Sequence, residues 1–222
     1  MFIGHFGLSF AAKKAAPRVS LGTLFIATQF VDILWPFLLV AHVEKVAITP
    51  GYSKYSAFEF LYYPYTHSLL MGAVWGVVSG TIYWLFKRDV RSAVVVGLCV
   101  LSHWFLDLVV HVADLPLTPY GDYKVGFGLW NNVALTLIVE TLLFLGGAYI
   151  YATFTKAKNR IGKGGLWVLV VLLLAVNLGN TFGPPPSPST SVMTMFVSFM
   201  ILMGVIISLA YWVDRNRSAA LK

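Results

Sequence analysis

Residues 101–111 read LSHWFLDLVVH and place three ionisable side chains inside an otherwise apolar run. His103, Asp107 and His111 are four residues apart, so in a helix they lie on one face, one turn after another. An aspartate at the centre of a bilayer costs at least about 2.5 kcal/mol, which argues against contact between this face and lipid tails. The stretch therefore predicts a membrane-spanning helix whose polar face lies against a wet cavity or a bound ion.

The composition of the whole chain also indicates a membrane protein. Of the 222 residues, 58% are hydrophobic and only 11% are charged, and a soluble core of this size cannot bury so much apolar surface. We expect an all-α polytopic membrane protein with a single transmembrane domain over residues 1–222. The lone Cys99 can form no intrachain disulfide. The net charge of +7 predicts no nucleic acid partner, because the distribution of the basic residues explains it better.

Six apolar segments are long enough to cross a bilayer. Thirteen of the sixteen Lys and Arg residues lie in the N-terminal segment, the second and fourth loops and the C-terminal segment. Because basic residues concentrate on the cytoplasmic side, both termini are expected in the cytoplasm. The sequence thus predicts a multi-pass protein of the bacterial cytoplasmic (inner) membrane, with the lipid bilayer as its surroundings. The predicted spans are residues 20–43, 64–86, 92–113, 127–154, 165–181 and 191–213.

The N-terminal segment, residues 1–18 (MFIGHFGLSFAAKKAAPR), does not fit a signal peptide, because its basic residues follow the apolar stretch instead of preceding it. The stretch is also too short to span a bilayer. Two alternatives stay open: a helix in the membrane interface, or a half-helix that enters the bundle from the cytoplasmic side. In the second alternative, His5 lies about 12 Å inside the membrane, at a rise of ~1.5 Å per residue from Lys13.

Acidic and histidine side chains also occupy other predicted spans. Neutral imidazole nitrogens and carboxylate oxygens suit zinc, manganese or iron, and one helical turn lets His103 and Asp107 share an ion. Further ligands must come from elsewhere in the chain, and the best donors are His67 and Asp32. A divalent metal, with zinc as first choice, is therefore the expected cofactor.

Two more ionisable side chains are candidates for acid–base catalysis. Glu140 lies in the middle of the fourth predicted span, where a desolvated carboxyl group can serve as general base or acid. His111 lies at the outer end of the third span, one turn beyond Asp107. A structural role is the alternative for Glu140, which could instead bond to Asn177 or Asn180 on the fifth span.

Four motifs follow one another in the first half of the chain: GHFGLSFAAKK, TQFVDILWP, YPYTHSLLMG and LSHWFLDLVVH. With them the chain resembles the predicted membrane-bound metal-dependent hydrolases of bacteria. That family carries an N-terminal His, an acidic motif after the first span, a T-H-S motif and an S-H-x-x-x-D motif. It is in turn distantly similar to zinc-dependent phospholipases C and zinc-dependent single-strand nucleases. Matched motif by motif, the resemblance implies a metal site made by His5, Asp32, His67, His103 and Asp107.

The leading functional prediction is a membrane-embedded metal-dependent hydrolase. A metal-activated water would attack an ester, with a phosphoester as first choice, of a lipid-like substrate, since the ligands lie at acyl-chain to headgroup depth. Two other classes stay open. One is a proton-coupled transporter or permease, in which the same groups relay protons, and the other is a non-catalytic subunit that binds membrane-protein partners. A buried polar network that only joins helices is the structural alternative.

Overall fold

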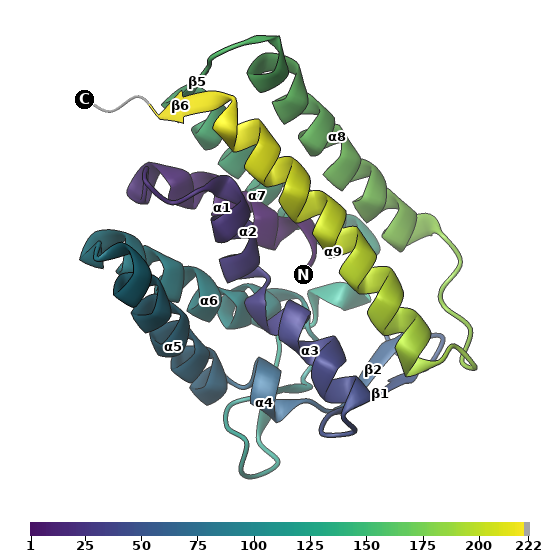
Figure 1. The fold of residues 1–222 in the computed structure, drawn as a ribbon. Coiled ribbons are helices and arrows are strands. Elements are labelled where there is room, and N and C mark those ends of the chain that lie inside the picture. The colour runs from purple at the N-terminus through teal and green to yellow at the C-terminus, as the bar shows by residue number, and fades with distance from the viewer. Residues whose placement is uncertain (220–222) are drawn as a thin grey trace.

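A bent first span and a buried N-terminal helix distinguish this fold from a simple six-helix bundle (Figure 1). The computed structural model describes residues 1–219. Among these residues, five helices are long and apolar enough to cross a membrane, and α2 with α3 forms a sixth, bent span. The predicted all-α polytopic architecture is confirmed. The helices are α1 (Ile3–Ala15), α2 (Leu21–Thr28), α3 (Phe30–Val40), α4 (Pro64–His67), α5 (Leu69–Lys87), α6 (Val90–Val110), α7 (Val133–Phe154), α8 (Arg160–Phe182) and α9 (Val192–Arg215).

The first predicted span, residues 20–43, is not one straight helix. α2 ends at Thr28 and α3 begins at Phe30, and the two helices are bent by 53° relative to each other. Gln29 between them has φ −101° and ψ 9°, away from helical geometry. At the bend the Thr28 carbonyl oxygen accepts a hydrogen bond from His103 Nδ1 at 2.7 Å. The break therefore lies at the level of the polar face of α6.

The N-terminal helix α1 lies inside the bundle and not in the membrane interface. Ile3, Phe6 and Phe10 are fully buried, and α1 packs mainly against α7, with further contacts to α2 and α6. Two glycines permit the close approach of α1 and α7, because a Cβ atom on Gly147 would overlap the carbonyl oxygen of Gly7. Of the two alternatives for this segment, the structure has the half-helix, and Figure 1 shows the N-terminus in the middle of the molecule.

A partly buried carboxylate, that of Asp214, fixes the C-terminal end of α1. Lys13 donates to Asp214 of α9 at 2.8 Å, and Tyr151 of α7 donates to the same carboxylate at 2.8 Å. The backbone N–H of Leu21, at the start of α2, donates to it at 3.1 Å. Four helices therefore meet at Asp214, and α1 cannot shift along the bundle without breaking these bonds.

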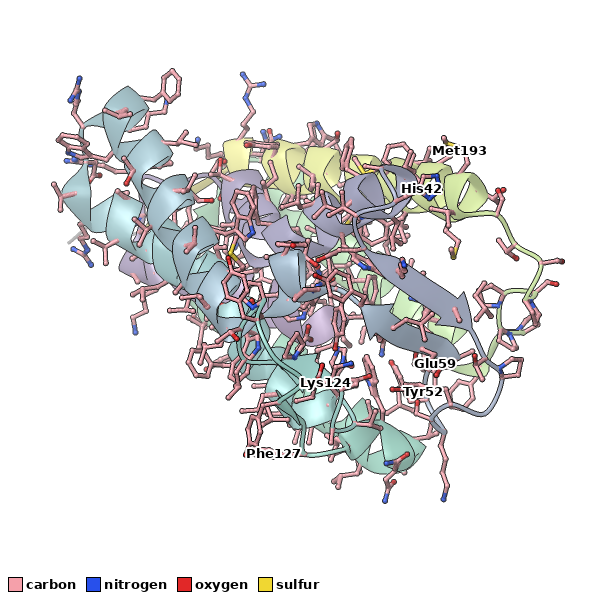
Figure 2. All side chains as sticks on the ribbon, turned by 90° about the horizontal axis from the view of Figure 1, so that it is seen from below. His42, Tyr52, Glu59, Lys124, Phe127 and Met193 are labelled. Carbon is pink, nitrogen blue, oxygen red and sulfur yellow. The ribbon has the colours of Figure 1, made fainter. Side chains whose placement is uncertain are left out.

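Short antiparallel strand pairs lie at the two ends of the bundle. The β1–β2 and β3–β4 hairpins are at one end, and the β5–β6 pair, whose strands are separated in the chain by α8 and α9, is at the other, where basic residues make it the predicted cytoplasmic side (Figure 1). Figure 2 looks onto the β1–β2 end, with His42, Tyr52, Glu59 and Lys124 among the side chains on this face. The strands are β1 (Lys45–Ile48), β2 (Phe58–Tyr62), β3 (Leu115–Pro116), β4 (Lys124–Val125), β5 (Thr155–Ala157) and β6 (Arg217–Ala219).

Candidate metal centre

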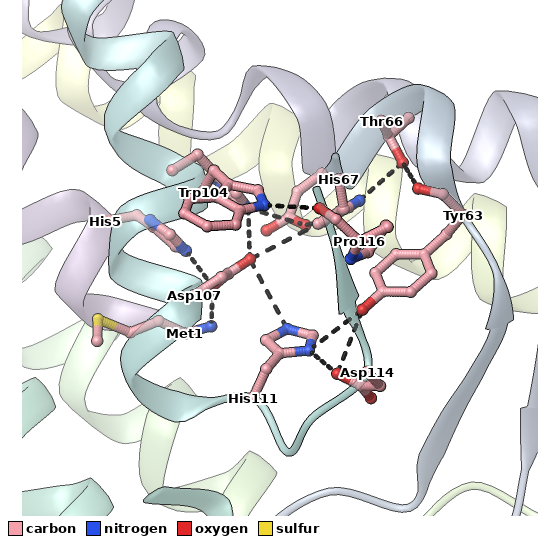
Figure 3. A network of polar contacts seen from close by, with 12 residues as sticks. Met1, His5, Tyr63, Thr66, His67, Trp104, Asp107, His111, Asp114 and Pro116 are labelled. Atoms are coloured by element: carbon pink, nitrogen blue, oxygen red, sulfur yellow. Dashed lines mark hydrogen bonds and ion pairs between the residues drawn. The ribbon is translucent and has the colours of Figure 1, made fainter. Parts of the chain in front are cut away.

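The carboxylate of Asp107, on α6, is the centre of a buried polar cluster (Figure 3). Its Oδ2 lies 3.0 Å from Nε2 of His103, which is one turn earlier on the same helix. Its Oδ1 lies 3.1 Å from Nε2 of His5 on α1 and 2.5 Å from the amino nitrogen of Met1. The side chains of Asp107, His103 and His5 are all buried. A carboxylate so far from water needs positively charged or hydrogen-bonding partners, and α1 and α6 supply them together.

A second group of donors adjoins the first. His67 Nε2 lies 3.2 Å from Asp32 Oδ1, and His103 Nε2 lies 3.5 Å from the same oxygen. His67 is the last residue of α4, a short helix that begins at Pro64, and Asp32 lies in the first turn of α3. The bend before α3 and the short helix α4 therefore bring donors from two more elements to the polar face of α6.

The two groups share His103. The first group, His5, His103 and Asp107, offers ligand atoms that lie within 4.8 Å of one another. The second group, Asp32, His67 and His103, meets the same limit of 4.8 Å. The structure thus brings together all five residues that are predicted as metal ligands. That they bind a metal stays a prediction.

Hydrogen bonds made by Nδ1 determine which ring nitrogen carries the proton in His103, on α6, and in His111, directly after it. His103 Nδ1 donates to the Thr28 carbonyl oxygen at 2.7 Å. His111 Nδ1 lies 2.8 Å from Asp114 Oδ1 and donates to that carboxylate. In a neutral ring the single proton is then on Nδ1, so Nε2 is unprotonated. Both Nε2 atoms face Asp107 Oδ2, at 3.0 Å for His103 and 3.8 Å for His111.

This arrangement fits a bound cation. His103 Nε2 makes no hydrogen bond within residues 1–219, although Asp107 Oδ2 is 3.0 Å away. An imidazole lone pair and a carboxylate oxygen repel each other at this distance unless positive charge lies between or beside them, and the Met1 amino group on Oδ1 supplies one such charge on the far side of the carboxylate. Imidazole nitrogen with carboxylate oxygen is a donor set that zinc and related divalent metals prefer. Additional ring protons would relieve the same repulsion in a proton pathway.

Asp114 is a site residue that the sequence analysis does not identify. Its carboxylate accepts hydrogen bonds from His111 Nδ1 at 2.8 Å, from Tyr63 at 3.3 Å and from Tyr52 at 3.0 Å. Burial and the neighbouring Asp114 raise the pKa of the Tyr52 phenol, which keeps it a donor. The position three residues after His111, just beyond α6, is the one feature of the sequence that could have indicated this role. Asp114 holds the ring of His111 against the cluster.

Glu140 holds the start of α1. Its Oε2 accepts the backbone N–H groups of Phe2 at 2.8 Å and of Gly4 at 3.4 Å. A carboxylate is favourable at a helix N-terminus, where N–H groups have no partner within the helix. The alternative partner Asn177 instead accepts a hydrogen bond from Tyr55 at 3.3 Å. These contacts give Glu140 a structural role, and its acid–base role stays a prediction.

A cavity of about 740 Å³ adjoins the donors. Its remaining walls come from α3, the β1–β2 hairpin, the η1 turn (Leu129–Asn131), the α8–α9 loop and α9, and they are mostly apolar. The cavity can therefore hold a molecule with a polar group at one end and an apolar body. The polar end is lined by Asp32, His67, Asp107 and His111, and the apolar walls include Trp35, Phe58, Phe60, Trp130, Phe199 and Leu202.

Comparison with known protein families gives one match. A family model described as YdjM inner membrane protein matches residues 56–182, which is more than half of the chain. The match includes all the predicted site residues except His5 and Asp32, which precede it. No curated protein and no solved structure matches the chain. With its long apolar helices, the chain is a multi-pass inner membrane protein and belongs to the YdjM inner membrane protein family.

Proposed function

We propose that this chain is a membrane-embedded metal-dependent hydrolase that cleaves an ester or phosphoester of a lipid-like substrate. The observation that carries the proposal is the convergence of three histidines and two aspartates from α1, α3, α4 and α6. This donor set suits zinc best, and it also suits manganese or iron. The resemblance of the four motifs to membrane-bound metal-dependent hydrolases supports the same function.

The residues around the centre have separable roles. A divalent ion bound there would polarise the scissile bond and lower the pKa of a water molecule towards about 7. His111 lines the cavity and its Nδ1 is held by Asp114, so its unprotonated Nε2 can accept a proton. The Asp114 carboxylate then stabilises the positively charged ring, as an orienting acid does in a catalytic triad. Glu140 fixes the start of α1 and thereby the helix that presents His5.

The cavity favours an amphiphilic substrate. Its polar end is at the donors, and its aromatic and aliphatic walls continue to Phe199 and Leu202 of α9. Each buried CH₂ group of a substrate chain contributes roughly 0.8 kcal/mol to binding. With both termini in the cytoplasm, as the basic residues predict, the centre lies in the outer half of the membrane. A lipid headgroup ester meets these conditions without an aqueous channel.

Elemental mass spectrometry of the detergent-purified protein, combined with a hydrolysis assay, tests the proposal. We expect near-stoichiometric zinc, manganese or iron, and hydrolysis of bis(p-nitrophenyl) phosphate that a chelator abolishes and added metal restores. A protein that contains no metal even after reconstitution contradicts the proposal and favours the transporter or the accessory subunit. A metal-loaded protein that cleaves neither this probe nor phospholipid esters contradicts the hydrolytic activity.

Leu202→Trp is expected to lower turnover of a long-chain phospholipid by about 10-fold, because the larger ring fills the apolar part of the cavity. Turnover of the small bis(p-nitrophenyl) phosphate should stay unchanged. Ile201→Trp is the matched control, since Ile201 is exposed on the adjacent face of α9. Parallel assays of the two substrates with the two variants check this prediction. Equal losses for both substrates would mean that the variant damages the fold and not a chain-binding site.

A further inference from the structure

Glu44 is a buried carboxylate outside the cluster of donors. It precedes β1 directly, at the start of the β1–β2 hairpin, and is only 2% exposed. An unpaired buried carboxylate is strongly unfavourable, so its position requires specific partners. Those partners come from α4, the short helix that carries His67.

Three donors from α4 surround the Glu44 carboxylate. Oε1 accepts the backbone N–H of Tyr65 at 2.8 Å and that of Thr66 at 2.9 Å. Oε2 accepts the hydroxyl of Thr66 at 2.7 Å. Burial raises the pKa of Glu44, and these hydrogen bonds act in the opposite direction. Glu44 is an acceptor in all three contacts, which is the role of an ionised carboxylate.

The Thr66 hydroxyl connects Glu44 with the ring of His67. Its Oγ1 lies 2.7 Å from His67 Nδ1. A hydroxyl has one proton, and this one is donated to Glu44, so Oγ1 accepts the proton of Nδ1–H. The neutral ring then has an unprotonated Nε2, which lies 3.2 Å from Asp32 Oδ1. Figure 3 shows the Thr66–His67 contact next to the Asp107 cluster.

We infer that Glu44 is a positioning residue of the centre: through Thr66 it keeps the proton of His67 on Nδ1 and leaves Nε2 available for a metal. The ligand role of His67 in this inference rests on the proposed function. The position of the His67 proton on Nδ1 does not require a metal. Loss of such an outer partner typically weakens metal binding by about 10- to 100-fold. Glu44 directly precedes the β1–β2 hairpin, which forms one wall of the cavity. The same contacts therefore also fix that wall relative to the His67 ring.

Glu44→Gln tests this relay, the chain of hydrogen bonds from Glu44 through Thr66 to His67, because it reverses the direction of the two bonds that Thr66 Oγ1 makes. The amide oxygen can still accept the two backbone N–H groups, but the amide nitrogen donates to Thr66, whose hydroxyl then donates to His67 Nδ1. Nitrogen-15 NMR of metal-free, histidine-labelled protein in lipid bilayers reports which ring nitrogen carries the proton, and the spectrum of His67→Gln assigns the signals. We expect the proton on Nδ1 in the unmodified protein and on Nε2 in Glu44→Gln.

A second pair of variants keeps the test decisive if Glu44→Gln does not fold. Thr66→Val removes the hydroxyl at nearly constant volume, whereas Thr66→Ser retains it. The preference for Nδ1–H should be lost in the first and recovered in the second. Glu59→Gln is the matched control, because Glu59 lies on β2 of the same hairpin and bonds to Thr49 instead. It should leave the His67 signals unchanged.

Zinc titration of the same proteins gives a second readout. We expect zinc to bind about 10- to 100-fold more weakly to Glu44→Gln and Thr66→Val than to the Thr66→Ser and Glu59→Gln proteins. A His67 proton that stays on Nδ1 in both Glu44→Gln and Thr66→Val overturns the inference. If the tautomer shifts as expected but the unmodified protein binds no metal, the relay is upheld and the proposed function fails.

Discussion

Asp107→Asn is expected to remove bound metal from the protein and to lower phosphoester turnover by about 10³-fold or more, a loss of about 4 kcal/mol. Asp107 has this effect because its carboxylate lies within 4.0 Å of four histidine rings. Its Oδ1 lies 3.1 Å from His5, and its Oδ2 lies 3.0 Å from His103, 3.8 Å from His111 and 4.0 Å from His67. Asparagine keeps the shape but loses the charge, and its NH₂ group occupies one ligand position.

The measurement is metal content by elemental mass spectrometry together with steady-state kinetics. Asp122→Asn is the matched control, since Asp122 is an exposed carboxylate between β3 and β4, and it should retain both metal and turnover. Thermal unfolding of both variants shows whether each is folded. An Asp107→Asn protein that is folded and keeps a full complement of metal would rule out this centre.

Gly147→Val is expected to displace α1 from the bundle and to lower the free energy of unfolding by about 3 kcal/mol or more. Overpacking usually costs about 1–3 kcal/mol when side chains can move, and here the obstacle is backbone. A Cβ atom on Gly147 would overlap the carbonyl oxygen of Gly7, and one on Gly7 would lie 2.5 Å from the Leu143 carbonyl oxygen. Because α1 carries His5, the variant should also lose metal affinity.

Gly146→Val provides the comparison for this prediction. Gly146 is the adjacent residue of α7, and a Cβ atom there meets nothing within 4 Å. Both variants gain the same side chain and lose a helical glycine, so the difference between their thermal unfolding midpoints in detergent isolates the contact with α1. Equal midpoints and equal metal content for the two proteins would show that α1 does not depend on this contact.

Much of the architecture follows from the pattern of residues along the chain. Apolar runs long enough to cross a bilayer predict the spans, because their length and composition are local properties. The four-residue spacing predicts that His103, Asp107 and His111 share a face, because α-helical geometry is regular. The cost of charge in lipid predicts that this face looks inward, and the structure has His103, Asp107 and His111 all buried.

The bend at Gln29 and the buried position of α1 do not follow from the sequence. Residues 20–43 form one mainly apolar run whose few polar residues are scattered along it, so composition does not show where the first span breaks. For residues 1–18 the sequence leaves an interfacial helix and a half-helix open, and packing of Gly7 against Gly147 decides for the half-helix. Both outcomes depend on which helices are neighbours, and helix packing is not encoded in local periodicity.

The partners that orient the site residues are likewise visible only in the tertiary structure. Thr28 and His103 are 75 residues apart, Phe2 and Glu140 are 138 apart, and Glu44 lies 22 residues before Thr66. No local pattern links groups at such separations. The sequence names the candidate ligands: helical spacing groups His103 with Asp107, residue chemistry adds His67 and Asp32, and the family resemblance adds His5. Only the fold determines which ring nitrogen each histidine turns towards Asp107, because that choice depends on hydrogen bonds made on the opposite side of the ring.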